Sequence, residues 1–315
     1  MRRLAAALFA VACTRAASPA NALPSAPDAA PDVAPAGSCA VPPNAPPEIV
    51  PLTLAAGVRC VRYPFALRGP RDAIELADGS VLVTEMGAGR VARLTNGAWS
   101  VFAEGLVSPI GIRALPDGGV LVAEENAQRV SLLRDGARTT VAEGIAQVTY
   151  LALDAAGRAY VSSFTAFAPT GRVLAFDARP GAEVTPFATG LDVPEGLLFA
   201  PDGRLLVAEW NGASRVRRLP AQGGATGDAE TVTAGFHGIY GLARLPSGDL
   251  LVADHGRDVA THGRVVRVAQ DGAQTVVVRD VKTPGGLSVT PRGDVLLTEF
   301  NAAGAVGYLI RLSGL

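Results

Sequence analysis

The sequence lacks several features that would place the chain in a common functional class. Its 28 Lys and Arg residues nearly balance its 29 Asp and Glu residues and form no basic run, so the charge pattern of a nucleic-acid binder is missing. No apolar run approaches the roughly 18 residues needed to span a bilayer. There is also no serine nucleophile elbow, phosphate-binding loop, dinucleotide fingerprint or Cys-X-X-Cys pair, which excludes the enzyme classes built on those motifs.

Residues 1–13 have the pattern of an export signal. Arginines near the start precede a short apolar run that ends at Ala12-Cys13. This ending resembles the lipobox of bacterial lipoproteins, although Ala10 stands where Leu is usual. Lipidation of Cys13 is therefore predicted, with cleavage after Ala22 as the alternative. The resemblance implies an exported chain that touches a membrane only through a lipid anchor, at the outer membrane or cell surface, and is otherwise periplasmic or secreted.

Residues 14–47 are rich in Ala, Pro, Ser and Asp and are predicted to form a tether in front of a domain at 48–315. Cys39 and Cys60 are expected to pair in an exported chain. The alternative is a free thiol at Cys39 and a small core residue at Cys60. The disulfide would close a loop of about 20 residues and contribute roughly 3 kcal/mol to stability.

The rest of the chain repeats one pattern six times. The ungapped copies begin at Pro70, Pro109, Val148, Pro194, Ile239 and Pro284. Each copy contains a strand, a tight turn of the Asp-Gly type and a second strand, and further strands follow. Six sets of four antiparallel strands predict an all-β chain folded as a six-bladed β-propeller.

The two ends of the repeat region predict how the ring closes. The last copy stops after its third strand, at Leu312, whereas residues 59–67 resemble a spare fourth strand. An N-terminal strand in the last blade would leave no open sheet edge between the termini. The expected disulfide would then attach the tether to this closing strand.

The residue X in the Pro-X-Gly start of each repeat, and the residue after it, are predicted to lie at the channel mouth. By channel mouth we mean the end of the propeller axis at which the first strands begin. The candidate ligand-binding residues at these positions are Arg71, Asp72, Thr149, Tyr150 and Tyr240, with Glu195 beside them. Such mixed polar and aromatic chemistry favours a ligand site, and the alternative is a polar rim that only faces water. Arg71 and Glu195 belong to opposite blades and are expected to face each other.

The repeats resemble those of the NHL and SMP-30/gluconolactonase propellers. The resemblance rests on the Pro-X-Gly-Leu, Pro-Asp-Gly and Leu-Val-Ala-Glu runs of residues 194–209 and their relatives, and it covers about residues 58–315. Virginiamycin B lyases have a similar repeat but seven blades. These motifs are specific for the architecture and weak for activity, because this scaffold hosts unrelated functions.

The gluconolactonase resemblance implies a divalent metal at the channel mouth, held by Glu, Asn and Asp at X positions. In this chain those positions fall on Arg71, Glu195 and Tyr240. Only Glu195 is a ligand for a hard cation, and an arginine would repel one. A lactonase of that type is therefore disfavoured.

The histidines form a second group of candidates. His237, His255 and His262 all lie in or beside the fifth repeat, on the channel-mouth face. Because histidine binds metals and changes protonation near neutral pH, these three and Glu195 are the candidate metal ligands. Glu195 and His255 are also the candidate catalytic residues. The spacing matches no tight ligand motif, and the alternative is a solvated loop.

Aromatic residues follow the last residue of the second strand in three repeats. They are Phe164, Trp210 and Phe300. Trp210 is the candidate for stacking on a ligand, and packing between blades is the alternative.

A carboxylate ends the second strand in five repeats. These carboxylates are Glu85, Glu124, Glu209, Asp254 and Glu299. An arginine opens the next strand in four of these repeats, so we predict acid–arginine pairs that fasten each loop rather than a catalytic ring. Ser163 replaces the acid in the third repeat and Tyr308 replaces the arginine in the sixth, so these two blades are expected to be partly unfastened.

The sequence favours a monomeric, extracytoplasmic propeller that binds a small molecule, a glycan or a protein at its channel mouth, with no nucleic-acid partner. The alternative is a hydrolase, such as a lactonase or esterase, or a lyase that uses the same face with one divalent metal ion. The residues alone leave the choice between binding protein and enzyme open.

Overall fold

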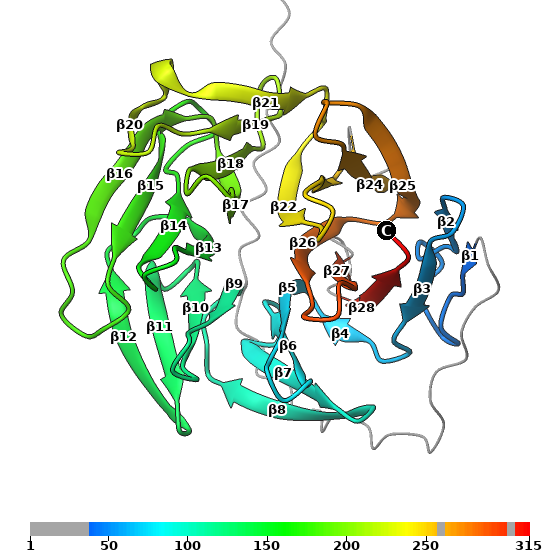
Figure 1. The fold of residues 1–315 in the computed structure, drawn as a ribbon. Helices are drawn as coiled ribbons and strands as arrows, with labels where there is room; N and C mark the ends of the chain where they lie inside the picture. Colours follow the sequence, from blue (N-terminus) through cyan, green and yellow to red (C-terminus); the bar gives the residue numbers. More distant parts are fainter. Residues whose placement is uncertain (1–37, 257–261, 301–305) are drawn as a thin grey trace, which may run out of the picture.

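The computed structural model describes residues 38–256, 262–300 and 306–315, which form a six-bladed β-propeller (Figure 1). Six antiparallel sheets stand in a ring around a central axis, and the first strand of each blade lies innermost, which confirms the predicted fold class. No helix within the described ranges is long and apolar enough to cross a membrane. The predicted export signal and Cys13 lie outside the described residues.

Each blade corresponds to one sequence repeat. Blade 1 contains β5 (Pro70–Glu75), β6 (Val81–Glu85), β7 (Arg90–Thr95) and β8 (Ala98–Glu104). Blade 2 contains β9 (Pro109–Ala114), β10 (Val120–Glu124), β11 (Arg129–Arg134) and β12 (Ala137–Glu143). Blade 3 contains β13 (Val148–Leu153), β14 (Ala159–Ser163), β15 (Gly171–Phe176) and β16 (Thr185–Leu191).

The second half of the ring follows the same plan. Blade 4 contains β17 (Pro194–Phe199), β18 (Leu205–Glu209), β19 (Arg215–Arg218) and β21 (Glu230–Ala234). Between β19 and β21 the chain forms β20 (Gly224–Ala225), which pairs in parallel with β16 of blade 3, and the 3-10 helix η1 (Thr226–Asp228). Blade 5 contains β22 (Ile239–Arg244), β23 (Leu250–Asp254), β24 (Gly263–Val268) and β25 (Gln274–Val281). Blade 6 contains β26 (Pro284–Val289), β27 (Val295–Phe300) and β28 (Val306–Ser313).

Local sequence explains why the repeats form these blades. The second strands, such as β6 and β10, are buried at every position because neighbouring blades cover both faces. The turn before β6 needs a positive φ, which Gly79 supplies at 80°, while the Asp78 carboxylate accepts the backbone N–H of Ser80. The hydrophobic core is accordingly divided among the interfaces between blades.

The N-terminal strand β3 (Arg59–Arg62) completes blade 6 by pairing with β28, with Cys60 opposite Leu312. The short strand β4 (Leu67–Arg68) pairs with the start of β28. The predicted closure of the ring is therefore confirmed. In Figure 1 the blue strand β3 lies beside the red strand β28.

Part of the segment before β3 forms strands, although its composition predicts an unfolded tether. Strands β1 (Ser38–Cys39) and β2 (Leu52–Leu54) extend blade 5, because β2 pairs with β25. The expected disulfide joins Cys39 to Cys60, with their Cα atoms 5.6 Å apart. Packing therefore begins at β1, ahead of the predicted domain boundary at residue 48, because strand pairing and the disulfide hold a segment too poor in apolar residues to fold alone. We call residues 38–62 the N-terminal strap.

Acid–arginine pairs fasten the mouth end of four blades, as the sequence predicts. The pairs are Glu85–Arg90 (2.5 Å), Glu124–Arg129 (2.9 Å), Glu209–Arg215 (2.6 Å) and Asp254–Arg264 (2.8 Å). Each carboxylate also accepts a backbone N–H from the preceding loop, as Glu124 does from Val107. These carboxylates are fully committed to the scaffold.

The prediction that blade 6 is partly unfastened is wrong. Arg62 of the strap replaces the missing arginine, and its guanidinium lies 3.0 Å from the Glu299 carboxylate. Arg62 also donates to the backbone carbonyls of Ala40 and Val50. In blade 3 the Ser163 hydroxyl instead donates to the carbonyl of Ala146 at 2.6 Å.

Candidate functional site

The channel mouth is dominated by one arginine held between aromatic rings. The guanidinium carbon of Arg71 lies 5.0 Å from the ring centre of Tyr240 and 4.4 Å from that of Phe300. Burial lowers the pKa of Arg71, but Tyr150, Tyr240 and nearby carboxyls raise it by more, so Arg71 stays charged. A fixed positive charge therefore sits at the end of the axis.

Arg71 has no carboxylate counter-ion of its own. Among the described residues it forms no ion pair within 4.0 Å, and its Nε has no hydrogen-bond partner. A partly buried cation without a counter-ion is costly, so this side of the mouth carries a positive charge that the described residues do not neutralise by an ion pair.

Glu195 is the carboxyl on the opposite blade, with only 5% of its surface exposed. Burial raises its pKa to about 8, while Arg71 lowers it and Glu125 raises it further. Its Oε2 has no hydrogen-bond partner among the described residues. Near neutral pH Glu195 is therefore mostly protonated and can donate as well as accept a hydrogen bond.

Tyr150 is 1% exposed, and its hydroxyl also lacks a partner among the described residues. Burial raises its pKa, which Arg71 opposes, so the phenol stays protonated and can act as a donor. Thr149, in contrast, is committed to the scaffold, since its hydroxyl lies 2.9 Å from that of Ser162. Of these two predicted mouth residues, only Tyr150 therefore has a hydroxyl available to hydrogen-bond a ligand.

Buried hydroxyls fix the backbone of the two charged mouth residues. Thr298 in blade 6 donates to the Arg71 carbonyl at 2.9 Å, and Ser162 in blade 3 donates to the Glu195 carbonyl at 2.8 Å. Thr84 bridges blades 1 and 2 in the same way, through the Ile110 carbonyl at 2.6 Å. Sequence reasoning missed these contacts, although Thr or Ser before the last residue of the second strand was a visible signal.

An arc of aromatic rings runs around the mouth from blade 3 to blade 6. Successive ring centres lie 5.8 Å apart from Phe164 to Phe167, 5.8 Å from Phe167 to Trp210, 6.4 Å from Trp210 to Tyr240 and 6.1 Å from Tyr240 to Phe300. Phe167 is 67% exposed and was not singled out from the sequence, because it lies in a loop outside the repeat. The indole Nε1 of Trp210 lies against Gly238, so its ring rather than its donor is offered to the mouth.

Asp72 does not line the mouth as predicted. It is fully buried, lies 2.7 Å from Arg113 and accepts the backbone N–H of Ile112, so it locks blade 1 to blade 2. Glu125, which was not among the predicted site residues, lies within electrostatic reach of Arg71, Glu195 and Tyr240. The sequence signal was its position directly after Glu124, where three other blades carry Phe or Trp.

The three histidines do not converge. His237 is exposed, and its backbone N–H donates to Asp254. His262 places Nε2 3.2 Å from the Glu48 carbonyl of the strap. His255 alone adjoins the mouth, with its ring centre 5.6 Å from that of Tyr240, and burial lowers its pKa, which the Gly256 carbonyl opposes. A neutral imidazole therefore stands beside the aromatic arc.

The divalent metal implied by the resemblance does not fit this donor set. Arg71 and Tyr240 occupy two of the three matching positions, which leaves the Glu195 carboxyl alone and opposite a fixed positive charge. Within the described ranges, no group of three or more His, Cys, Asp or Glu side chains is arranged to hold a cation. The mouth therefore supports no metal-assisted step.

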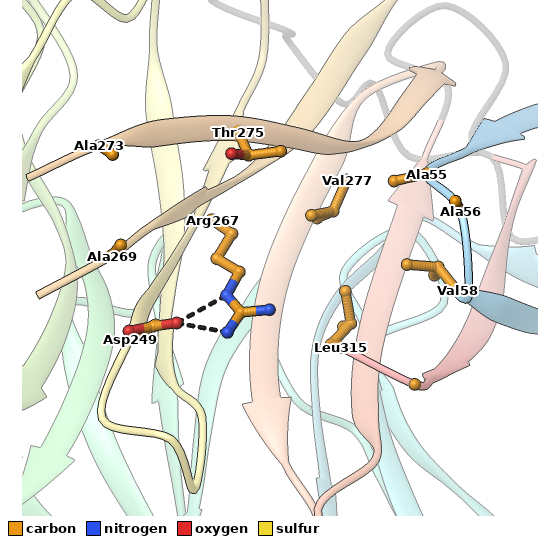
Figure 2. A pocket seen from close by; sticks show the side chains of 11 residues that line it. Ala55, Ala56, Val58, Asp249, Arg267, Ala269, Ala273, Thr275, Val277 and Leu315 are labelled. Atoms are coloured by element: carbon orange, nitrogen blue, oxygen red, sulfur yellow. Dashed lines mark hydrogen bonds and ion pairs between the residues drawn. The ribbon is translucent and has the colours of Figure 1, made fainter.

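Two hollows in the described structure lie away from the mouth. The one in Figure 2 has a volume of about 340 Å³ and lies between blade 5 and the strap, near Val58 and Leu315. Its charged residues, Arg267 and Asp249, satisfy each other at 2.6 Å. The second, of about 710 Å³, lies along the outer strands of blades 1 and 2. We place the site at the mouth because buried polar atoms of Arg71, Tyr150 and Glu195 lack hydrogen-bond partners among the described residues there, beside a positive charge that has no ion pair.

No protein-family model and no curated protein matches the chain. Solved structures do match. The chain has the fold of the gluconolactonase-like propellers. A gluconolactonase from Xanthomonas campestris is 14% identical over 82% of this chain and 91% of its own, with a TM-score of 0.67. A Trichoderma reesei protein of carbohydrate-active enzyme family AA12 is 16% identical over 84% and 98%, with a TM-score of 0.62.

A catalytically inactive virginiamycin B lyase from Staphylococcus aureus, solved with quinupristin, is 16% identical over 78% of this chain and 80% of its own, with a TM-score of 0.58. Identities this low establish the gluconolactonase-like fold and leave the activity of this chain undetermined.

Proposed function

We propose that this propeller binds a small organic molecule at its channel mouth. The observation that supports this most directly is the meeting of three buried polar atoms that lack hydrogen-bond partners among the described residues, beside an aromatic wall. They are Nε of Arg71, the hydroxyl of Tyr150 and Oε2 of Glu195. In folded proteins such groups are nearly always satisfied, so an unpaired set at one place favours a bound partner.

A ligand screen by thermal stabilisation tests this proposal. Hits from a panel of sugars, lactones, amino acids and organic acids should raise the unfolding midpoint of the wild type. The effect should be lost in Trp210→Ala, which removes a partly exposed ring from the middle of the arc. It should be kept in Arg93→Met, which changes the end of blade 1 away from the mouth. Hits that are indifferent to Trp210 would place binding elsewhere.

The second candidate function is a hydrolase or lyase at the same face. It is favoured by the names of the structural neighbours and by Glu195, whose pKa of about 8 suits a general acid near neutral pH. Turnover of lactone and ester panels should then fall by about 100-fold or more in Glu195→Gln. His255→Ala should lower turnover if the neutral imidazole is the proton acceptor. Unchanged rates in both variants would remove this candidate.

We also propose that the chain works outside the cytoplasm as a lipid-anchored monomer. The Cys39–Cys60 disulfide supports export, because such bonds persist in oxidising compartments. In cell fractionation, the wild type should appear with the membranes and Cys13→Ser should become soluble. A Cys13→Ser protein that stays with the membranes would contradict a lipid anchor.

A further inference from the structure

Arg71, which is partly buried, differs from two arginines that stabilise the scaffold, Arg62 and Arg113. Arg62, whose side chain is 1% exposed, lies 3.0 Å from Glu299, and Arg113 lies 2.7 Å from Asp72. Arg71 has no ion-pair partner within 4.0 Å among the described residues. Arg62 and Arg113 each have a carboxylate partner and Arg71 has none within the described residues, so the charge of Arg71 is available to a ligand anion.

The groups beside Arg71 match an acceptor. The Tyr150 hydroxyl is buried and has no hydrogen-bond partner among the described residues, and Arg71, Glu195 and Tyr240 lie within electrostatic reach of it. Arginine and phenol both donate hydrogen bonds, and a carboxylate accepts two or more at once. A neutral sugar hydroxyl would use this donor pair less fully.

The charge around Arg71 favours a monoanion over a dianion. Glu195 and Glu125 lie within electrostatic reach of Arg71, and burial raises the pKa of both. One guanidinium can balance one carboxylate, whereas a phosphate dianion would add a second negative charge beside two carboxyl groups. The mouth is therefore poorly suited to phosphate esters.

The walls beside Arg71 favour a flat apolar body on the ligand. Tyr240 and Phe300 flank its guanidinium, and Trp210 continues the same wall. At the X position of blade 6, Gly285 has no room for a side chain, since an added Cβ would lie 2.5 Å from the Thr298 hydroxyl and 3.5 Å from the Phe300 ring. The ring of Phe300 can therefore approach Arg71 closely.

We infer that the channel mouth takes a monocarboxylate with a flat, unsaturated body, its carboxylate on Arg71 and Tyr150 and its body against the aromatic arc. This rests on the proposed function, because it names the ligand class of the same site. One such ligand would account for the Arg71 guanidinium without an ion pair, the Tyr150 hydroxyl without a hydrogen bond and the aromatic wall.

Isothermal titration calorimetry on the folded propeller, with the disulfide intact, tests the inference. The probes are benzoate, phenylacetate and cinnamate, each compared with its neutral amide. The proteins are the wild type, Arg71→Met and the matched control Arg93→Met. The control removes an arginine from the end of blade 1 away from the channel mouth. At least one acid should bind about tenfold or more tighter than its amide, and Arg71→Met should abolish that preference. Arg93→Met should retain it.

Three results would overturn the inference. The acids could bind no better than their amides, Arg71→Met could keep the preference, or none of the three acids could bind. Neutral hits that still depend on Trp210 would leave the proposed function standing while removing the carboxylate. If no compound in either panel binds in a Trp210-dependent way, both proposals fall together.

Discussion

Arg62 and Arg71 are both arginines withdrawn from solvent, yet the fold treats them in opposite ways. Arg62 meets the Glu299 carboxylate and two backbone carbonyls, so its charge is absorbed by the structure. Arg71 meets two aromatic faces and no carboxylate within the described residues. The charge of Arg62 is neutralised within the scaffold, whereas the charge of Arg71 has no ion pair among the described residues.

The comparison predicts the largest loss of stability for removal of the Arg62–Glu299 ion pair. Arg62→Met should lower the free energy of unfolding by about 3–5 kcal/mol, because Glu299 is left buried without its partner. Urea unfolding of both proteins measures the difference. Arg93→Met, which removes a partly exposed arginine, should cost about 1 kcal/mol or less. Equal losses in the two variants would mean that burial does not distinguish these pairs.

Removing the disulfide should have the next largest effect. Replacing Cys39 and Cys60 together by Ser should lower the free energy of unfolding by about 2–4 kcal/mol, because the strap is no longer fixed to the closing strand. Urea midpoints of the double variant and the wild type, both under oxidising conditions, give the value. A wild type whose midpoint is insensitive to a reductant would argue against this role.

The pH dependence of stability tests the environment of Glu195, the carboxyl on the blade opposite Arg71. Its pKa rises from 4.5 to about 8 on folding, so between these values the folded state binds more protons than the unfolded one. The free energy of unfolding should therefore fall as pH rises from about 4.5 to about 8, at up to about 1.4 kcal/mol per pH unit. Glu195→Gln should flatten this slope in urea titrations at several pH values. The matched change Glu104→Gln, at an exposed glutamate of β8, should leave the slope as it is.

The smallest effect on stability should come from Arg71 itself. Arg71→Met should change the free energy of unfolding by no more than about 1 kcal/mol, because the lost cation–π contacts are offset by the relief of an unpaired buried charge. Urea unfolding beside Arg62→Met tests this directly. A loss as large as that of Arg62→Met would show that Arg71 has a structural partner and would weaken the case for a ligand.

Much of the scaffold could be predicted because the same strand pattern recurs in every blade and the same acid–arginine contact in most of them. The repeat placed Glu85, Glu124 and their equivalents in one role, and the structure agrees. Arg62 was missed because it lies outside the repeat and reaches blade 6 only after the ring closes. No comparison among repeats can reveal a contact made by a segment that occurs once.

The candidate site was less predictable for a related reason. The position of a residue in the repeat predicts how far along the propeller axis it lies. It does not predict whether its side chain points into the channel mouth or into the interface between two blades. Arg71 turns toward the rings of Tyr240 and Phe300, whereas the next residue, Asp72, turns into the interface with Arg113. Phe167 comes from a loop whose length and course the repeat does not fix.

The strap also sets the order in which the chain can assemble. Cys39 and Cys60 are separated by 21 residues, so this link can form as soon as the first blade is being made. Strand β3 must then wait for β28, its partner at the far end of the chain. Contacts so distant in sequence are slow to form, so ring closure should be the last step of folding. Until that step β3 is an unpaired strand, and the disulfide to β1 limits how far it can move from the rest of the strap.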